Sequence, residues 1–192
     1  DRALLGKIER HDGNVLSLDI APDIDLGPVR QRKGAHALAL ADHAVIDIPE
    51  FGALVASGQC NSYEGPLFTG VDLGTANTVL AVVDSDGHPV AGATARSKGV
   101  RDGIVVDYVG TVQAVSRMKA ALEEKLGCEL PVAATAIPPG IIEGNVKCIA
   151  NVVEGAGFEV RGIADEPSAA SEILGIQEGA VVDVGGGTTG IS

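Results

Sequence analysis

The chain contains no tryptophan and very few other aromatic residues. Of its 192 residues only three are phenylalanine and two are tyrosine, yet the hydrophobic share is 45%. The core therefore has to be built from alanine, valine, isoleucine and leucine. Such side chains suit closely packed strands and helices.

Cysteines and long apolar runs are also scarce. Cys60, Cys128 and Cys148 lie far apart and form no C-x-x-C pair, so we expect reduced thiols rather than a zinc or redox site. No apolar stretch reaches the length of a bilayer span without interruption by charge or glycine, and nothing resembles a signal peptide. The sequence predicts a cytoplasmic protein.

Basic residues are few, at 14 against 26 acidic residues, which gives a formal net charge of −12. One basic cluster occurs, at residues 30–33, without interleaved aromatics. An acidic chain repels phosphodiester backbones, so nucleic acid is excluded as a partner. Glycine, by contrast, is abundant, with 26 residues, which favours several tight turns.

Two glycine turns share one layout. Asp72 is followed by Gly74-Thr75-Ala76-Asn77, and Asp183 is followed by Gly185-Gly186-Gly187-Thr188-Thr189. Glycine lets backbone N–H groups converge on an anion, threonine adds hydroxyl donors, and aspartate can hold hydrated Mg²⁺. Either turn alone is as easily a plain hairpin turn. The duplication favours a clamp around the phosphates of a nucleotide.

Apolar periodicity predicts alternating strands and helices after residue 65. We expect strands at 68–72, 77–83, 89–94, 131–137, 158–163 and 180–184. Helices are expected from Thr111, as N-cap, to Gly127, over 142–153, and from 165–167 onward. The order βββαβαβα, followed by one strand, is typical of an α/β fold with a mixed sheet and helices on its faces.

Residues 1–64 carry weaker signals and are interpreted as an N-terminal extension, separate from a lobe at 65–192. A strand at 15–20 and a helix at 48–57 are the clearest elements there. The acidic stretch around Asp23 lacks the glycine and glutamate of an EF-hand loop, which favours a linker. The chain looks cut at both ends. Strand 180–184 is therefore expected to join the edge of the first lobe's sheet or to promote self-association.

Five segments, in order and at consistent spacing, carry a family resemblance: residues 70–76, 100–107, 133–140, 165–170 and 182–191. With them, residues 65–192 resemble the first lobe of the actin, heat-shock chaperone and sugar-kinase ATPase superfamily, cut at the start of the second lobe. That resemblance implies a ribonuclease-H-like lobe. Within the superfamily, the chain is similar to the chaperone-like ethanolamine-utilisation proteins.

The resemblance implies roles for individual residues. Asp72 and the turn 74–77 would form the first phosphate motif, and 185–189 the second. Asp183 would lie near Mg²⁺ and the attacking water, which Glu166 would orient. Glu166 also fits a structural role, as a carboxylate in the first turn of a helix. ATP and Mg²⁺ are the implied cofactors, and Asp72 and Asp183 the metal residues. The phosphate-binding lysine of the heat-shock chaperones has no clear counterpart, and Lys98 is a candidate by position alone.

The function implied by the resemblance is that of a chaperone-like, actin-fold ATP-binding protein of bacterial ethanolamine utilisation. Ethanolamine ammonia-lyase or microcompartment proteins would be its partners. ATPase activity is expected only of a longer protein, and this chain is expected to be inactive. Two alternatives stay open: a cytoskeletal or scaffold protein of the cell-division or pilus-assembly type, and a small-molecule kinase of the same superfamily.

Overall fold

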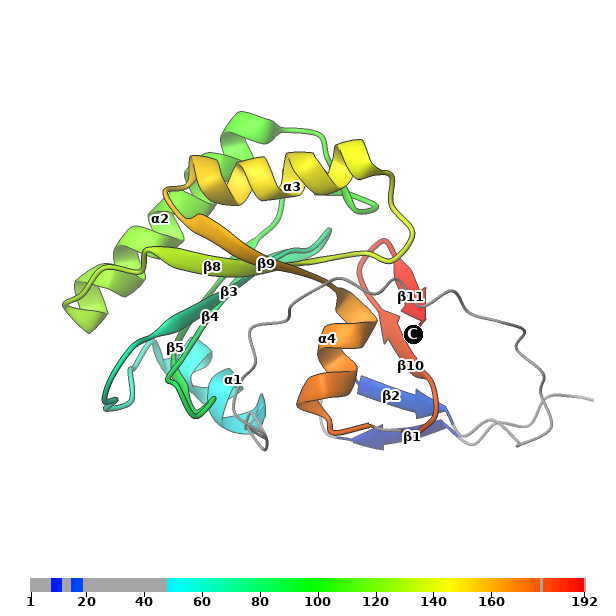
Figure 1. Ribbon diagram of the computed structural model, residues 1–192, viewed down its shortest axis with the longest axis horizontal. Coiled ribbons are helices and arrows are strands. Elements are labelled where there is room, and N and C mark those ends of the chain that lie inside the picture. Colours follow the sequence, from blue (N-terminus) through cyan, green and yellow to red (C-terminus); the bar gives the residue numbers. More distant parts are fainter. Residues whose placement is uncertain (1–7, 12–14, 19–47, 177, 192) are drawn as a thin grey trace, which may run out of the picture.

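A five-stranded mixed sheet forms the centre of the computed structural model, which describes residues 8–11, 15–18, 48–176 and 178–191 (Figure 1). Its strands are β3 (Phe68–Leu73), β4 (Asn77–Val83), β5 (Pro89–Arg96), β8 (Val132–Ile137) and β9 (Glu159–Asp165), in the order β5-β4-β3-β8-β9. The first three strands form an antiparallel meander, and β3, β8 and β9 run parallel. The predicted mixed sheet is confirmed.

Helices lie on both faces of this sheet (Figure 1). One face carries α2 (Tyr108–Leu126) and α3 (Glu143–Gly155), and the other carries α1 (Ile48–Ser57) and α4 (Glu166–Ile173). Helix α1 has the bounds expected from the sequence and packs on β5. A Cβ at Gly92 would lie 2.5 Å from the Phe51 ring and 2.7 Å from Val55, so glycine allows this close approach. None of the described helices is long and apolar enough to cross a membrane.

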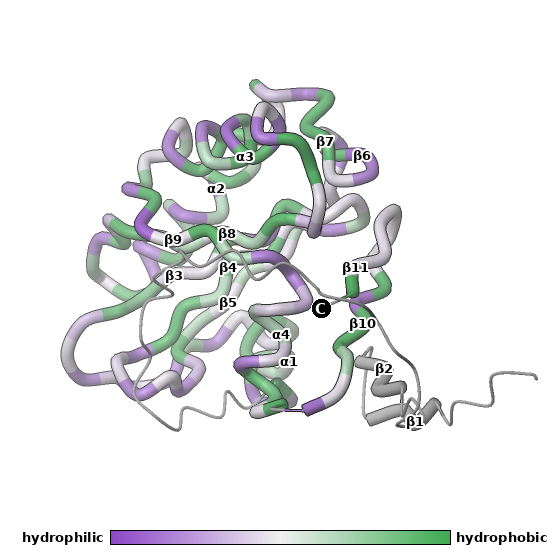
Figure 2. The backbone as a smooth tube through the Cα atoms, turned by 45° about the vertical axis from the view of Figure 1, so that its right-hand side comes forward, coloured by the Kyte–Doolittle hydropathy of each residue, from purple (hydrophilic) through white to green (hydrophobic). Residues whose placement is uncertain are grey.

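The core between the sheet and helices α2 and α3 is aliphatic, as the composition predicts. Strand β4 alternates, with Leu80 and Val82 fully buried between half-buried neighbours. Val115 of α2 and Val152 of α3 are fully buried as well, and apolar residues follow the central strands in Figure 2. Burial of this aliphatic surface is the main force that stabilises the lobe.

A second sheet has the strand order β1-β2-β10-β11. It contains β1 (Ile8–His11), β2 (Val15–Leu18), β10 (Val181–Val184) and β11 (Thr189–Ile191). Strand β10 pairs antiparallel with β11 on one side and with β2 on the other. The expectation that strand 180–184 adds to the edge of the first sheet is therefore wrong, because an N-terminal strand supplies its partner. The basic cluster at 30–33, Asp23 and the end of the predicted strand 15–20 lie outside the described residues.

Helix α2 begins earlier than predicted, after a small hairpin of β6 (Val100–Arg101) and β7 (Ile104–Val105). Its N-cap is Asp107, whose carboxylate accepts from the Gly110 N–H at 2.9 Å. Thr111 lies inside the helix and its hydroxyl donates to the Asp107 carbonyl. Aspartate and threonine are both good caps. The backbone bonds from Val106 and Asp107 to the Gly99 carbonyl fix the chain so that Asp107 takes the role.

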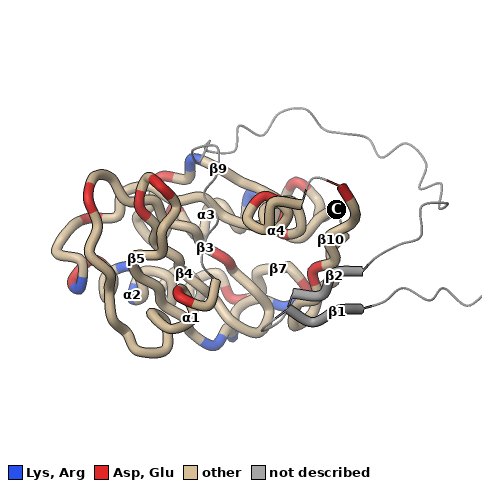
Figure 3. The backbone as a smooth tube through the Cα atoms, turned by 90° about the horizontal axis from the view of Figure 1, so that it is seen from below, with Lys and Arg blue, Asp and Glu red and all other residues tan. Residues whose placement is uncertain are grey.

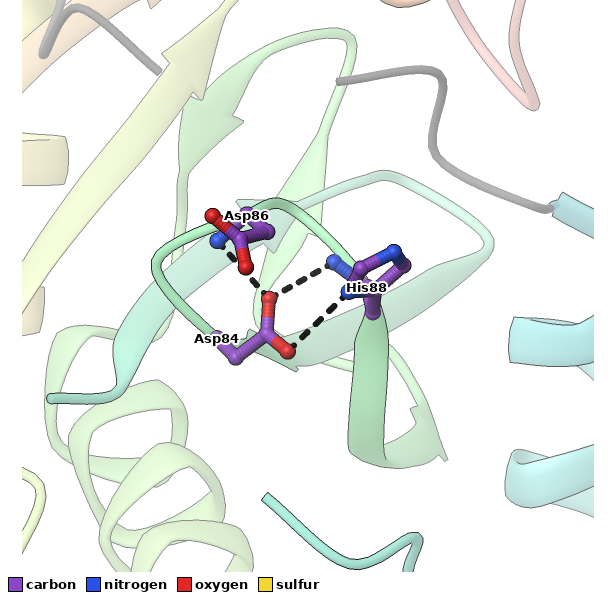
Figure 4. A group of neighbouring side chains, drawn as sticks. All are labelled: Asp84, Asp86 and His88. Atoms are coloured by element: carbon purple, nitrogen blue, oxygen red, sulfur yellow. Dashed lines mark hydrogen bonds and ion pairs between the residues drawn. The ribbon is translucent and has the colours of Figure 1, made fainter. Parts of the chain in front are cut away.

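The predicted turn between β4 and β5 is held by Asp84 (Figure 4). Its carboxylate accepts from the backbone N–H groups of Asp86 and His88, both at 2.9 Å, and lies 3.2 Å from His88 Nδ1. Burial raises the pKa of Asp84, but these hydrogen bonds and the imidazole outweigh it, so the pKa lies below its ordinary value. The Asp84 carboxylate therefore stabilises the turn through the backbone of Asp86 and through the backbone and side chain of His88.

Candidate functional site

The two glycine turns lie against each other, between the first sheet and the second sheet (Figure 1). A Cβ at Gly186 would lie 2.8 Å from the Ala76 Cβ and 3.2 Å from its backbone nitrogen. A Cβ at Gly187 would lie 3.0 Å from the Thr75 hydroxyl oxygen. Side chains at these two positions would force the turns apart. The turn after β3 and the turn after β10 are thus in direct contact and form one candidate site.

Glycine and proline contacts hold the second turn against the first lobe. A Cβ at Gly190, in β11, would lie 2.7 Å from Pro167 and 3.0 Å from Pro139. Pro139 follows β8, and Pro167 is in the first turn of α4, which Asp165 caps by accepting from the Ser168 N–H. The second turn is therefore positioned by two rigid residues that both follow strands of the first sheet.

Three carboxyl groups lie close enough to interact: Asp72 from β3, Asp183 from β10 and Glu166 from the start of α4. Burial, and then the charge of Asp183, raises the pKa of Asp72 to about 6. Burial raises the pKa of Glu166 to about 7, with further contributions from the charges of Asp72 and Asp183 and a hydrogen bond to Asp183. Burial and mutual repulsion disfavour full ionisation of the three carboxyl groups, so the cluster favours binding of protons or of a cation.

The arrangement fits a hydrated cation better than a closed metal cage. Within the described part of the chain, only Asp84, Asp86 and His88 bring three ligand atoms within 4.8 Å of one another. In the group of Asp72, Asp183 and Glu166, at least one pair of ligand atoms is therefore farther apart than that. Mg²⁺ keeps several waters and is usually held by one or two carboxylates together with phosphates. These carboxylates and the threonine hydroxyls of the two turns supply a donor set of that kind.

The structure brings together the site residues that the sequence singled out, although their chemical roles stay predictions. Asn77 begins β4 and Thr189 begins β11, so both turns end at these residues. Lys98 is exposed, in the loop before β6. Sequence reasoning missed Asp102, at the tip of the β6–β7 hairpin. The available signal was the Asp-Gly pair between two short apolar runs, which is typical of a two-residue hairpin turn.

Glu166→Gln is expected to make thermal stability less dependent on pH. Because the folded-state pKa of Glu166 is about 7, above its ordinary value, the folded protein binds this proton more tightly than the unfolded chain. The wild type should lose stability as the pH rises from about 5 through 7. Glutamine stays neutral, so the variant should melt at a higher temperature than the wild type at pH 8 and at a similar temperature at pH 5.

The matched control is Glu143→Gln, which removes an exposed carboxylate paired with Lys147 and should change little. Parallel melting curves of Glu166→Gln and the wild type at both pH values would contradict the prediction.

The sheet order and the two facing turns define the class: this is the ribonuclease-H-like lobe of an actin-like ATPase fold. Over 141 residues the chain is 44% identical to the ethanolamine utilization protein EutJ of Salmonella typhimurium, an alignment that covers 71% of the chain and 50% of that relative. The crystal structure of EutJ from Carboxydothermus hydrogenoformans matches with a TM-score of 0.72 and 49% identity, covering 75% of this chain and 53% of that one. The chain is thus similar to EutJ proteins over most of its own length.

The chain spans about half the length of these EutJ relatives. A more distant relative is the cell division protein FtsA of Enterococcus hirae, which is 31% identical over 80 residues, or 40% of this chain and 18% of that protein. No protein-family model matches the chain.

Proposed function

We propose that this chain supplies the phosphate- and Mg²⁺-binding half of a nucleotide site in a chaperone-like protein of ethanolamine utilisation. The observation that carries the proposal is the direct contact of two glycine turns at positions where a Cβ would collide. Backbone N–H groups of such turns bind phosphate oxygens. Two turns facing each other suit ATP, whose phosphates offer oxygens in more than one direction.

In the proposed site, Asp72 and Asp183 would hold Mg²⁺. When bound, Mg²⁺ would neutralise phosphate charge and polarise the terminal phosphoryl group. Glu166 is the group that orients a water and accepts its proton, because a carboxyl group whose pKa is near 7 can act as a base close to neutral pH. Its hydrogen bond to Asp183 links the proton-accepting group to the metal-holding group.

The biological context is proposed from the relatives. Their name places them in ethanolamine utilisation, so ethanolamine ammonia-lyase or microcompartment proteins are the proposed partners, in the cytoplasm. The identity to FtsA over 80 residues favours a second candidate, a scaffold or cytoskeletal role in which nucleotide controls assembly.

Calorimetric titration of ATP with and without Mg²⁺ tests the proposal. We expect Mg²⁺-dependent binding with a Kd nearer mM than μM, because the phosphates account for only part of a nucleotide's contacts. Asp183→Asn should remove most of the Mg²⁺ dependence, since it removes a metal-holding charge. Asp86→Asn removes an exposed charge at the opposite end of β4 and should leave binding unchanged. Failure of the wild type to bind, or equal Mg²⁺ dependence in all three proteins, would contradict the proposal.

A further inference from the structure

The tip of the β6–β7 hairpin reaches the glycine turns from a third direction. Asp102 and Gly103 form the two-residue connection, with φ angles of 50° and 73°. Positive φ at both central residues is the mark of a type I′ turn, which suits an Asp-Gly pair. The turn therefore explains the backbone of Asp102, but it does not determine what the carboxylate faces.

The carboxylate of Asp102 faces the second glycine turn. A Cβ at Gly187 would lie 2.5 Å from Asp102 Oδ1, on the same side as the Thr75 hydroxyl at 3.0 Å. The hairpin is anchored there, because a Cβ at Gly103 would lie 2.8 Å from Pro138. Asp102 thus touches the point where the two turns come together.

The charge at this point is unfavourable for a bare phosphate. Asp72, Asp183 and Glu166 already form a cluster of interacting carboxyl groups, and Asp102 adds a further carboxylate beside Gly187. Within the described part of the chain, the ion pairs involve other residues and leave Asp102 without a cationic partner. In Figure 3 acidic positions also outnumber basic ones along the backbone. A polyanion that binds at the second turn therefore meets the negative charge of Asp102 in addition to that of the carboxyl cluster.

We propose that Asp102 is a specificity-determining residue that repels uncomplexed phosphate and so makes the site select phosphate that carries a divalent cation. The inference rests on the proposed nucleotide site. It adds that the site binds the nucleotide as its metal complex rather than as the metal-free anion. A charge in contact with the turns acts on the phosphate directly, and bound Mg²⁺ weakens the repulsion because it cancels part of the phosphate charge. The β6–β7 hairpin is then a wall of the site as well as the lead into α2.

Asp102→Asn tests the inference with little risk to the fold, because asparagine also tolerates positive φ and Asn-Gly is a favoured type I′ pair. ATP, ADP and inorganic tripolyphosphate are titrated into the wild type, Asp102→Asn and Asp86→Asn, each with Mg²⁺ and with EDTA. We expect Asp102→Asn to tighten binding of metal-free ATP and tripolyphosphate by about tenfold. Binding of Mg²⁺-complexed ATP should change by less than about threefold, and the gain should shrink as salt is added.

The outcomes separate the inference from the proposed function. Tighter metal-free binding in Asp102→Asn alone supports the inference, even where wild-type binding is barely measurable. Equal affinities of wild type and Asp102→Asn overturn it while leaving the nucleotide site intact. Weaker Mg²⁺-ATP binding by Asp102→Asn also overturns it, because Asp102 would then help to hold the metal. A gain of the same size in Asp86→Asn overturns it in favour of net charge alone. If none of the three proteins binds any ligand, the proposed function fails together with the inference.

Discussion

Gly186→Val is expected to abolish nucleotide binding while the lobe stays folded. A Cβ at position 186 would lie 2.8 Å from the Ala76 Cβ and 3.2 Å from the Ala76 nitrogen, and valine adds two methyl groups beyond it. The turns would have to separate or rotate, which would misplace the N–H groups meant for phosphate. Loss of those oriented donors should weaken ATP binding by more than about a hundredfold, equivalent to about 2.8 kcal/mol.

Gly144→Ala is the matched control for this change. Gly144 lies in α3, and a Cβ there would have no heavy atom within 4 Å. Alanine should stabilise the helix by about 0.5–1 kcal/mol and leave ATP affinity unaltered. Circular dichroism and calorimetry on both variants would check the pair. Nucleotide binding by Gly186→Val at wild-type strength would show that the contact of the two turns is not part of the site.

Leu80→Ala is expected to have the largest effect on folding, lowering the free energy of unfolding by about 2–5 kcal/mol. Leu80 is 0% exposed, in the middle of β4, and its removal leaves a cavity in a closely packed core that is mostly aliphatic. Chemical denaturation would measure the loss. Ile142→Ala, at a residue that is 71% exposed, should change the free energy by no more than about 0.5 kcal/mol. Similar losses in the two variants would contradict this account of the core.

Local patterns were enough to predict the five strands of the first sheet and the presence of the helices that cover it. Alternation in β4, the φ of 68° that makes Gly127 a helix C-cap, and Pro167 in the first turn of α4 all depend on neighbours in sequence. The two glycine turns were recognisable for the same reason, because backbone approach to an anion requires glycine locally. Glu166 was singled out as a third carboxylate only because of the family resemblance.

Features that depend on distant contacts could not be predicted in the same way. The pairing of β2 with β10 joins opposite ends of the sequence, and two short strands carry no signal of which edge they choose. The choice of Asp107 over Thr111 as helix N-cap depends on backbone bonds to the Gly99 carbonyl. Asp102 is a routine turn residue by its local sequence. Its place beside Gly187 appears only when the hairpin packs on Pro138.

The contact between Gly186 and Ala76 also limits how the two turns can diverge in evolution. Because a methyl group already occupies the space at Ala76, the pair can accommodate one small side chain but not two. A substitution that enlarges position 186 should therefore survive only with a compensating reduction at position 76. Ala76→Gly should accordingly act as a second-site suppressor of Gly186→Ala. The side-chain sizes at positions 76 and 186, in the turns of two different sheets, should therefore change together.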